Sequence, residues 1–296
     1  MSIKTKAAGI FRSALTLISP RLNTAVSYRV KFGRRWDTEH PKTLNDKILW
    51  LKFNTYWENP TIKQCADKLR VRDYLTEHGF GDLLNELIGV YYNVDDIDWD
   101  SLPDQFALKL NVGCACNIIV SDKSKLDIEA AKAKMRKWLK SNYWLGWSEM
   151  QYKDVKPCIL VERYLGSPDG TLPEDYKFYC LNGEAKYVMV CVDREIGKHA
   201  TFYYFDREWN MMPYSEDYFK DPNRVIPKPA HIEEAFEAAE KLSGEFPFVR
   251  TDLYIVNGKV YFGELTFTPS AGLDQGRLPE TDRILGEQLK LPGDKQ

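Results

Sequence analysis

Alternating apolar and polar residues in the last fifth of the sequence predict two strands joined by a tight turn. Side chains of a strand point alternately to its two faces, so Arg250 and Asp252 share one face of the first strand. Glu264 and Thr266 likewise share one face of the second strand. The intervening positions are apolar at Val249, Leu253, Ile255, Leu265 and Phe267. The pattern therefore predicts a hairpin with one charged face and one core face.

The register of this hairpin decides whether its charged residues meet. Asn257 and Gly258 tolerate positive φ and favour a two-residue turn, which would place Asp252 and Glu264 on opposite faces. A three-residue loop that includes Lys259, with a bulge at Gly258, would pair the two carboxylates directly. Facing carboxylates repel each other unless a divalent cation lies between them, and hard oxygen ligands favour magnesium. We expect the three-residue loop; the alternative is an exposed hairpin with scattered charges.

The rest of the chain alternates between helical and strand patterns. Apolar residues at helical spacing predict helices over residues 1–19, 43–52, 61–78, 127–140, 231–243 and 279–290, the first of them ended by Pro20. Short β-prone runs predict strands over residues 83–92, 106–110, 118–120, 158–161, 175–180, 185–192 and 201–205. Residues 210–229 are expected to be irregular. Together these elements predict an α+β fold with mainly antiparallel strands.

Composition excludes some classes of function but does not indicate a particular reaction. The chain has 296 residues, which suits one multi-lobed domain or two to three smaller ones. A net charge of −2 gives no field that would favour nucleic acid, so we expect no nucleic-acid partner. The six cysteines lack CxxC spacing, which predicts reduced thiols in a cytoplasmic protein and no zinc site.

The first residues of the sequence combine basic and apolar side chains. Arg12 interrupts the apolar stretch of residues 1–19, and no small-residue cleavage site follows, so a secreted leader is not expected. One interpretation is an amphipathic helix that contacts a membrane surface, which would make the protein membrane-peripheral. The other is a helix packed on its own domain. The basic run over residues 27–35 is similarly open, as either a solvated surface or a contact for an anionic substrate.

Several isolated charges are ambiguous when taken singly. Lys109 ends an apolar strand directly before a loop of small residues, 111–117, whose amides could bind phosphate together with the lysine. The loop lacks the GKS or GKT sequence and the following helix of a P-loop. Lys68, Glu162 and Asp175 could each be a solvated surface charge or a nucleotide contact.

The order of these segments resembles the TupA-like ATP-grasp family, which is associated with polysaccharide gene clusters. The resemblance runs from about Tyr28 to Pro292 through KTLNDKILWLK, QCADKLRVRDYL, DQFALKLN, NIIV, ILVERYL, DYKFYCLNGEAKYV and VRTDLYIVNGKVYFGELTFTP. It implies an ATP-grasp fold in which two α+β lobes with mainly antiparallel sheets hold ATP. We expect a helical and basic N-terminal region over residues 1–60, a preceding segment over 61–105, a small lobe over 106–165 and a large lobe with the metal site over 166–296.

The resemblance also implies the ligands of ATP and magnesium. It places the phosphates at Lys68, Lys109 and Lys177, the ribose at Asp175, and the adenine at Glu162, Tyr164 and Leu165. Asp252, Glu264 and Thr266 would ligate magnesium, with Thr266 where an asparagine is usual. Arg250 would stabilise the phosphate during transfer. The phosphate loop departs from an HGSGGN-like pattern and keeps one glycine, Gly113, so strain is expected wherever a lost glycine needed positive φ.

The implied reaction is a two-step ligation. ATP phosphorylates a carboxylate, and an amine then displaces the phosphate to form an amide. The expected partners are a carboxylate sugar or nucleotide sugar and an amino acid or other amine, in the synthesis of a surface polysaccharide such as capsule or O-antigen. One alternative is a sugar kinase, which would transfer phosphate to a hydroxyl group. Another is a nucleotide-binding scaffold in which the altered loop has weakened turnover.

Overall fold

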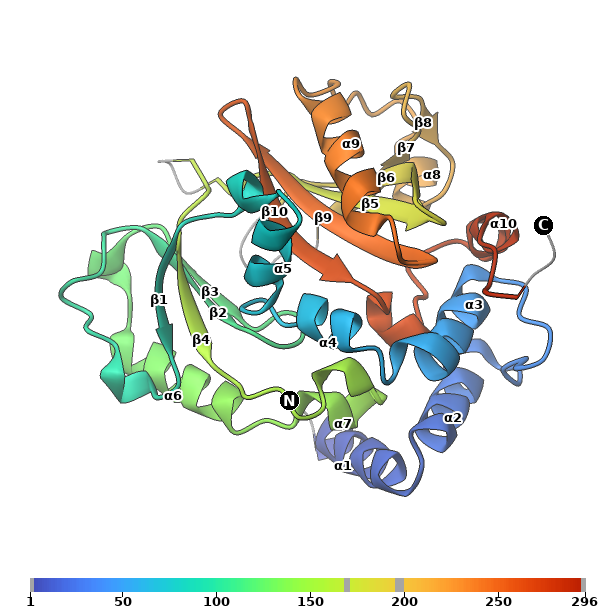
Figure 1. Cartoon of the computed structure of the whole chain (residues 1–296), viewed down its shortest axis with the longest axis horizontal. Coiled ribbons are helices and arrows are strands. Elements are labelled where there is room, and N and C mark those ends of the chain that lie inside the picture. The colour runs from blue at the N-terminus through green and yellow to red at the C-terminus, as the bar shows by residue number, and fades with distance from the viewer. Residues whose placement is uncertain (1–2, 168–170, 195–199, 294–296) are drawn as a thin grey trace. The chain divides into compact units, whose positions relative to one another are not determined.

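The computed structural model describes residues 3–167, 171–194 and 200–293 (Figure 1). The chain divides into two compact units. The first combines Met1–Asn59, Leu145–Glu149 and Glu174–Gln296, and the second combines Pro60–Trp144 and Met150–Pro173. Each unit has its own antiparallel sheet and helices. The α+β fold with antiparallel sheets and a helical N-terminal part is therefore confirmed.

The second unit is built on a four-stranded sheet with the order β1-β4-β2-β3. Its strands are β1 (Leu87–Tyr91), β2 (Phe106–Leu110), β3 (Asn117–Val120) and β4 (Ile159–Arg163). Its helices are α4 (Pro60–Ala66), α5 (Val71–Glu77) and α6 (Ile128–Leu139), and α7 (Tyr143–Trp147) continues into the first unit. Asp127 caps α6 through the amide of Ala130. Met135 of α6 packs with Phe106 and Val161 in the core of this unit.

The first unit is built on a six-stranded sheet with the order β10-β9-β5-β6-β7-β8. Its strands are β5 (Asp175–Leu181), β6 (Glu184–Val192), β7 (Thr201–Phe205), β8 (Met211–Met212), β9 (Phe248–Val256) and β10 (Lys259–Thr266). Its helices are α1 (Ile3–Ile18), α2 (Pro20–Phe32), α3 (Leu44–Leu51), α8 (Glu216–Lys220), α9 (Ile232–Ser243) and α10 (Pro279–Gln288), with a π-helix η1 (Lys52–Tyr56) and a short turn η6 (Pro269–Gly272).

Helix α9 covers one face of the six-stranded sheet (Figure 1). The rings of Phe178 on β5 and Phe236 on α9 meet edge to face with centroids 4.9 Å apart. Val249 and Leu253 of β9 lie on the same face as Phe178 and are fully buried. Burial of this face leaves the alternate residues of β5 and β9 on the opposite face of the sheet, where the charged residues lie.

The structure corrects several predicted boundaries. Pro20 does end α1, but it also begins α2, because Ser19 caps that helix and Pro20 takes its first position. The predicted helix over 61–78 is two helices, since the Asp67 side chain accepts hydrogen bonds from the amides of Leu69 and Arg70 and closes a turn there. Strand β1 is shorter than predicted. Residues 210–229 are partly ordered as β8 and α8. Each of the described helices is too short or too polar to cross a lipid bilayer.

Candidate functional site

One row of charged residues crosses three strands of the six-stranded sheet. Lys177 of β5 pairs with Asp252 of β9, and Asp252 pairs with Glu264 of β10. In the next row, Arg250 of β9 pairs with Thr266 of β10. Paired residues of neighbouring strands project to the same face. The structure therefore brings five of the predicted residues together on the face opposite α9.

The predicted pairing of Asp252 with Glu264 is confirmed, but the predicted turn is wrong. Val256 pairs with Lys259, so Asn257 and Gly258 form a two-residue turn, with φ of 51° and 74°. The register changes instead between Phe262 and Glu264, where one extra residue, Gly263, forms a bulge. The bulge moves Glu264 to the face of Asp252, which the two-residue turn alone would not do.

Asp252 is the centre of the charge cluster. Its side chain is 3% exposed. Arg250 donates two hydrogen bonds of 2.7 Å to its two oxygens, and Lys177 donates one of 2.6 Å. Burial raises the pKa of Asp252, and the charges of Arg250 and Lys177 oppose that rise. With two cations at hydrogen-bonding distance, Asp252 remains a carboxylate at neutral pH.

The two cations of the cluster are held in their charged forms. Burial lowers the pKa of Lys177, but Asp175 and Asp252 outweigh burial, and the pKa lies above its ordinary value. Burial also opposes the charge of Arg250, and Asp252 more than compensates, so that the pKa of Arg250 lies well above its ordinary value. Both side chains therefore keep a positive charge at neutral pH, next to the carboxylates of Asp175, Asp252 and Glu264, and each can donate to an anionic phosphate.

Asp175 extends the cluster along β5. One of its oxygens accepts a 2.6 Å hydrogen bond from Lys177. The other oxygen, Oδ1, is buried and accepts no hydrogen bond from any residue that the structure describes. A buried carboxylate oxygen without a donor is costly. A ligand hydroxyl group would satisfy it, as the predicted ribose contact requires.

The second carboxylate of the predicted metal site shares the same guanidinium. Thr266 donates a 3.1 Å hydrogen bond to Glu264, and Arg250 donates one of 3.2 Å to Thr266. The Arg250 and Glu264 side chains are 3.6 Å apart. Among described residues, no group of three or more His, Cys, Asp or Glu side chains is arranged to hold a metal ion. The donor set fits magnesium as it binds with nucleotides, where one or two carboxylates are completed by phosphate oxygens and water.

The other predicted residues lie in the second unit. Lys109 of β2 and Glu162 of β4 form a 2.6 Å ion pair, and Arg72 lies 3.6 Å from the same carboxylate. The two residues assigned to phosphate and to adenine therefore contact each other. Tyr164 and Leu165 follow β4 and are half-buried. These residues belong to the second unit, and the charge cluster belongs to the first.

The predicted phosphate loop has the strained backbone expected of it. Gly113 and Ala115 both have positive φ, of 73° and 58°, and only the first is a glycine. Lys68 donates a hydrogen bond to the carbonyl of Gly113. The hydroxyl of Tyr143 accepts a 3.0 Å hydrogen bond from the amide of Cys114. A phosphate that used this amide would have to displace Tyr143.

Lys52 is a buried residue that the sequence patterns did not single out. It is 2% exposed and donates hydrogen bonds of 2.8 and 3.1 Å to the carbonyls of Trp147 and Ala271. Ala271 lies in η6, in a run of left-handed residues from Ser270 to Gly272. The one available signal was its spacing, since Lys52 follows Leu44 and Ile48 on an apolar helix face. Lys52 therefore anchors the loop that follows the charge cluster.

Replacing Lys52 with methionine should change how stability depends on pH. Burial lowers the pKa of Lys52 from 10.5 to about 8, against the attraction of Glu149. Between these values the unfolded chain binds more protons than the folded one, so the contribution of Lys52 to the free energy of unfolding rises with pH. From pH 7 to 10.5, the free energy of unfolding of the parent protein should therefore increase by about 3 kcal/mol relative to that of Lys52→Met. Urea unfolding at both pH values measures it.

A matched control is Lys137→Met, on the exposed side of α6. The free energy of unfolding of Lys137→Met should differ from that of the parent protein by the same amount at both pH values. If the Lys52→Met difference is also constant, then Lys52 keeps its proton on folding and burial does not control its charge.

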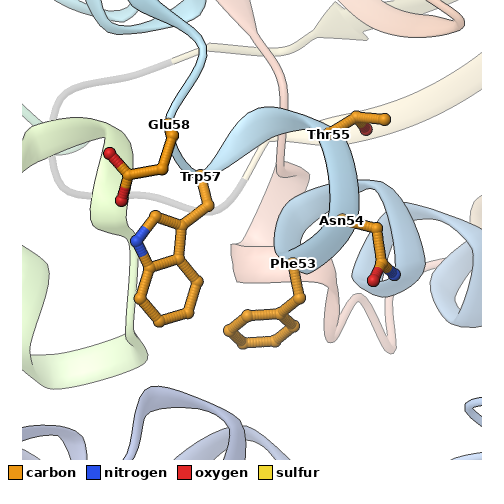
Figure 2. Close-up of a pocket in the computed structure, with 5 residues that line it drawn as sticks. All are labelled: Phe53, Asn54, Thr55, Trp57 and Glu58. Carbon is orange, nitrogen blue, oxygen red and sulfur yellow. The ribbon is translucent and has the colours of Figure 1, made fainter.

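A small cavity of about 280 Å³ lies beside η1 (Figure 2). Its lining residues are Phe53, Asn54, Thr55, Trp57 and Glu58, none of which belongs to the predicted set. The rings of Phe53 and Trp57 lie side by side with centroids 5.6 Å apart (Figure 2). The Asn54 and Thr55 side chains donate hydrogen bonds back to helix carbonyls. These contacts explain Asn54 and Thr55 as parts of the helix, and none of the lining residues belongs to the charge cluster.

A family model decides the assignment of the chain. The model of the TupA-like ATP-grasp family matches residues 46–290. The chain belongs to this family. Membership in the TupA-like ATP-grasp family confirms the ATP-grasp fold expected from the sequence and supports an ATP-dependent ligase activity.

Solved structures resemble the chain only distantly, and the curated proteins give no match. A D-alanine–D-alanine ligase from Bacillus anthracis complexed with ATP is 15% identical, with 76% of this chain and 63% of that chain covered and a TM-score of 0.44. The corresponding ligase from Helicobacter pylori is 15% identical over 84% and 69%, with a TM-score of 0.43. An ADP complex of N5-carboxyaminoimidazole ribonucleotide synthetase is 12% identical over 75% and 50%, with a TM-score of 0.44. None of the curated proteins compared with the sequence matches it.

Proposed function

We propose that this protein is an ATP-dependent ligase that joins a carboxylate to an amine. The observation that carries the proposal is the cluster in which Arg250 and Lys177 both contact Asp252, with Glu264 paired beside it. In a member of the TupA-like ATP-grasp family, fixed cations next to two carboxylates suit a phosphate and its magnesium ion. Cys191 of β6 pairs with Asp175 beside the cluster, but burial raises the pKa of its thiol to about 12, and the proposed reaction requires no protein nucleophile.

The residues of the cluster take separate roles in the proposal. Arg250 and Lys177 neutralise the phosphate that is transferred, and the side chain of Arg250 is already oriented by its two bonds to Asp252. Asp252 and Glu264, with Thr266, would hold magnesium. When bound, magnesium supplies positive charge that stabilises the phosphates during transfer. The free oxygen of Asp175 accepts a hydrogen bond from a ribose hydroxyl.

The second unit is proposed to bind the remainder of the nucleotide. Lys68 and Lys109 contact phosphates, and Glu162, Tyr164 and Leu165 surround the adenine. Two contacts support this assignment. Lys68 donates a hydrogen bond to the carbonyl of Gly113 in the loop, and Lys109 donates one to the carboxylate of Glu162. The Lys109–Glu162 ion pair would have to loosen for each residue to take its own ligand.

The proposed reaction has two balanced steps. A carboxylate oxygen of the acceptor attacks the γ-phosphorus of ATP, ADP leaves, and an acyl phosphate forms. The nitrogen of the amine then attacks the acyl carbon, phosphate leaves, and the amine nitrogen loses a proton.

For substrates we propose a uronic-acid carboxylate, on a nucleotide sugar or lipid-linked glycan, and an amino acid. This choice rests on the association of the family with surface polysaccharide such as capsule. A cytoplasmic site of action is part of the proposal, and the six free cysteines fit it.

We expect repeated turnover, with more than one ADP released per protein molecule, only when a carboxylate and an amine are both present. The test is a screen of amino acids against UDP-linked uronic acids with ATP and magnesium, followed by mass spectrometry of the product. The ligase is supported by a product whose mass equals the two substrates less one water. Omission of either substrate is the matched control and should reduce repeated ADP release to background.

Two other outcomes of the screen would replace the ligase. A phosphorylated sugar formed without an amine would identify a sugar kinase. ATP binding without ADP from any pair would favour a nucleotide-binding scaffold. The positive φ of Ala115 and the contact of Tyr143 with the loop amide are the observations that favour the scaffold.

A further inference from the structure

Helix α1 turns Arg12 and Thr16 toward the protein. Thr16 is buried and donates a 2.7 Å hydrogen bond to the carbonyl of Leu145, and the amide of Asn23 on α2 donates one of 2.8 Å to Thr16. One turn earlier, the guanidinium of Arg12 lies 4.3 Å from the centre of the Trp147 ring. Residues four apart share one face of a helix. These contacts fix the rotation of α1 about its axis.

The opposite face of α1 is apolar and exposed. Residues 7, 10, 11, 14, 17 and 18 follow the i, i+3, i+4, i+7 spacing of a single helix face, and all six are exposed. The large ones are exposed by 72% at Ile10, 58% at Phe11, 69% at Leu17 and 75% at Ile18. An ordinary surface helix has the reverse arrangement, with apolar residues inward. The arrangement in α1 suits a helix whose outer surroundings are not water.

Helix α2 continues the exposed apolar surface. Of the nine large apolar side chains that are exposed among described residues, six lie on α1 and α2. The two on α2 are Leu22 and Val30. Val30 also lines a hollow of about 550 Å³ together with Arg29 and Arg35. Apolar and basic side chains are therefore adjacent on α2 and the segment after it.

The charge of this part of the chain is of one sign. Residues 1–36 contain eight basic residues and no acidic residue, and the first acidic residue is Asp37. The rest of the chain has 33 basic and 43 acidic residues. An exposed apolar helix face on a segment of net positive charge suits a helix that lies in the interface of an anionic bilayer.

We propose that α1 and α2 bind the protein to the surface of a membrane that contains anionic lipid. The apolar side chains of α1 enter the interface, and basic residues such as Arg29 and Arg35 contact lipid phosphates. The helices lie in the plane of the interface, because no described helix can cross a bilayer. A second copy of the chain is a poorer occupant, since a symmetric contact would bring two segments of eight positive charges together.

The test is flotation of the full chain with vesicles. Vesicles of phosphatidylcholine with about one third phosphatidylglycerol should bind the protein, and vesicles of phosphatidylcholine alone should bind it at least tenfold more weakly. Binding should weaken in 0.5 M salt. The double variant Phe11→Ser with Ile18→Ser should lose at least tenfold in binding. Its thermal unfolding and ADP release in solution should match the parent, because both side chains are exposed and lie outside the charge cluster.

The control is the double variant Phe219→Ser with Val225→Ser, which removes two equally exposed apolar side chains elsewhere in the first unit. It should bind vesicles as the parent does. The proposal is overturned if both double variants bind alike, or if neutral and anionic vesicles bind alike. A dimer in solution that the Phe11→Ser and Ile18→Ser changes dissociate, without vesicle binding by the parent, would assign the surface to a second copy instead.

Discussion

Replacing Arg250 with alanine should lower the rate of ADP formation about a thousandfold while the protein remains folded. Arg250 donates two hydrogen bonds to Asp252 and one to Thr266, so its guanidinium is held in one orientation at the cluster. A cation oriented in advance stabilises the charge of a phosphate in transfer without reorganisation. Steady-state ADP release with excess substrates gives the rate, and ATP titration calorimetry gives the binding separately.

The variant also removes one of two cations from a buried carboxylate, so folding must be measured beside activity. Lys177 still contacts Asp252 in Arg250→Ala, which limits the loss of stability. If the alanine variant does not fold, Arg250→Lys keeps the charge but lacks the planar fork, and it should still lose about a hundredfold in rate. Arg283→Ala is the matched control, because Arg283 also has two carboxylate partners but lies exposed on α10. A folded Arg250→Ala protein within tenfold of the parent rate would exclude a catalytic role.

The charged face of the hairpin was predictable because it depends on alternation alone. Period two places Arg250 with Asp252 and Glu264 with Thr266, whatever the turn is. The cross-strand pairing was also predicted correctly, since facing carboxylates made sense only with a cation between them. The bulge that produces this pairing was not predicted. The rule that derives register from a turn considers only the two central residues of the turn and ignores the strand that follows. A signal for the bulge was present, since Gly263 is an isolated glycine inside a strand pattern.

Other features depend on contacts that no local pattern contains. The Lys52 carbonyl partners lie 95 and 219 residues away in the sequence. A helix pattern can mark Lys52 as misplaced on an apolar face but cannot supply its acceptors. The outward apolar face of α1 is a similar case, because periodicity shows that a helix has an apolar face without showing which face the protein covers. Only the contacts of Thr16 and Arg12 decide that.

The bulge itself should be testable through its glycine. A Cβ atom at position 263 would lie 2.8 Å from the carbonyl oxygen of Asp252 and 3.1 Å from the ring of Tyr254. The first contact is with backbone, which cannot move aside cheaply. Alanine in place of glycine ordinarily stabilises a strand by roughly 0.5–1 kcal/mol. Gly263→Ala should instead destabilise the protein by about 1–3 kcal/mol, because the bulge must shift.

The same change should weaken the binding of ATP with magnesium, since a shift of the bulge turns Glu264 away from Asp252. Urea unfolding gives the stability, and titration of ATP with and without magnesium gives the binding; the loss should be larger with magnesium. Gly146→Ala is the matched control, because Gly146 lies in α7 and a Cβ there meets nothing within 4 Å. It should leave the magnesium-dependent binding unchanged and should not lower the stability, since alanine favours a helix by up to about 1 kcal/mol over glycine. If Gly263→Ala keeps its stability and its magnesium-dependent binding, then the bulge does not require glycine. Deletion of Gly263 would then be the change that removes the bulge and separates Glu264 from Asp252. If ATP binding still depends on magnesium after this deletion, the metal binds elsewhere.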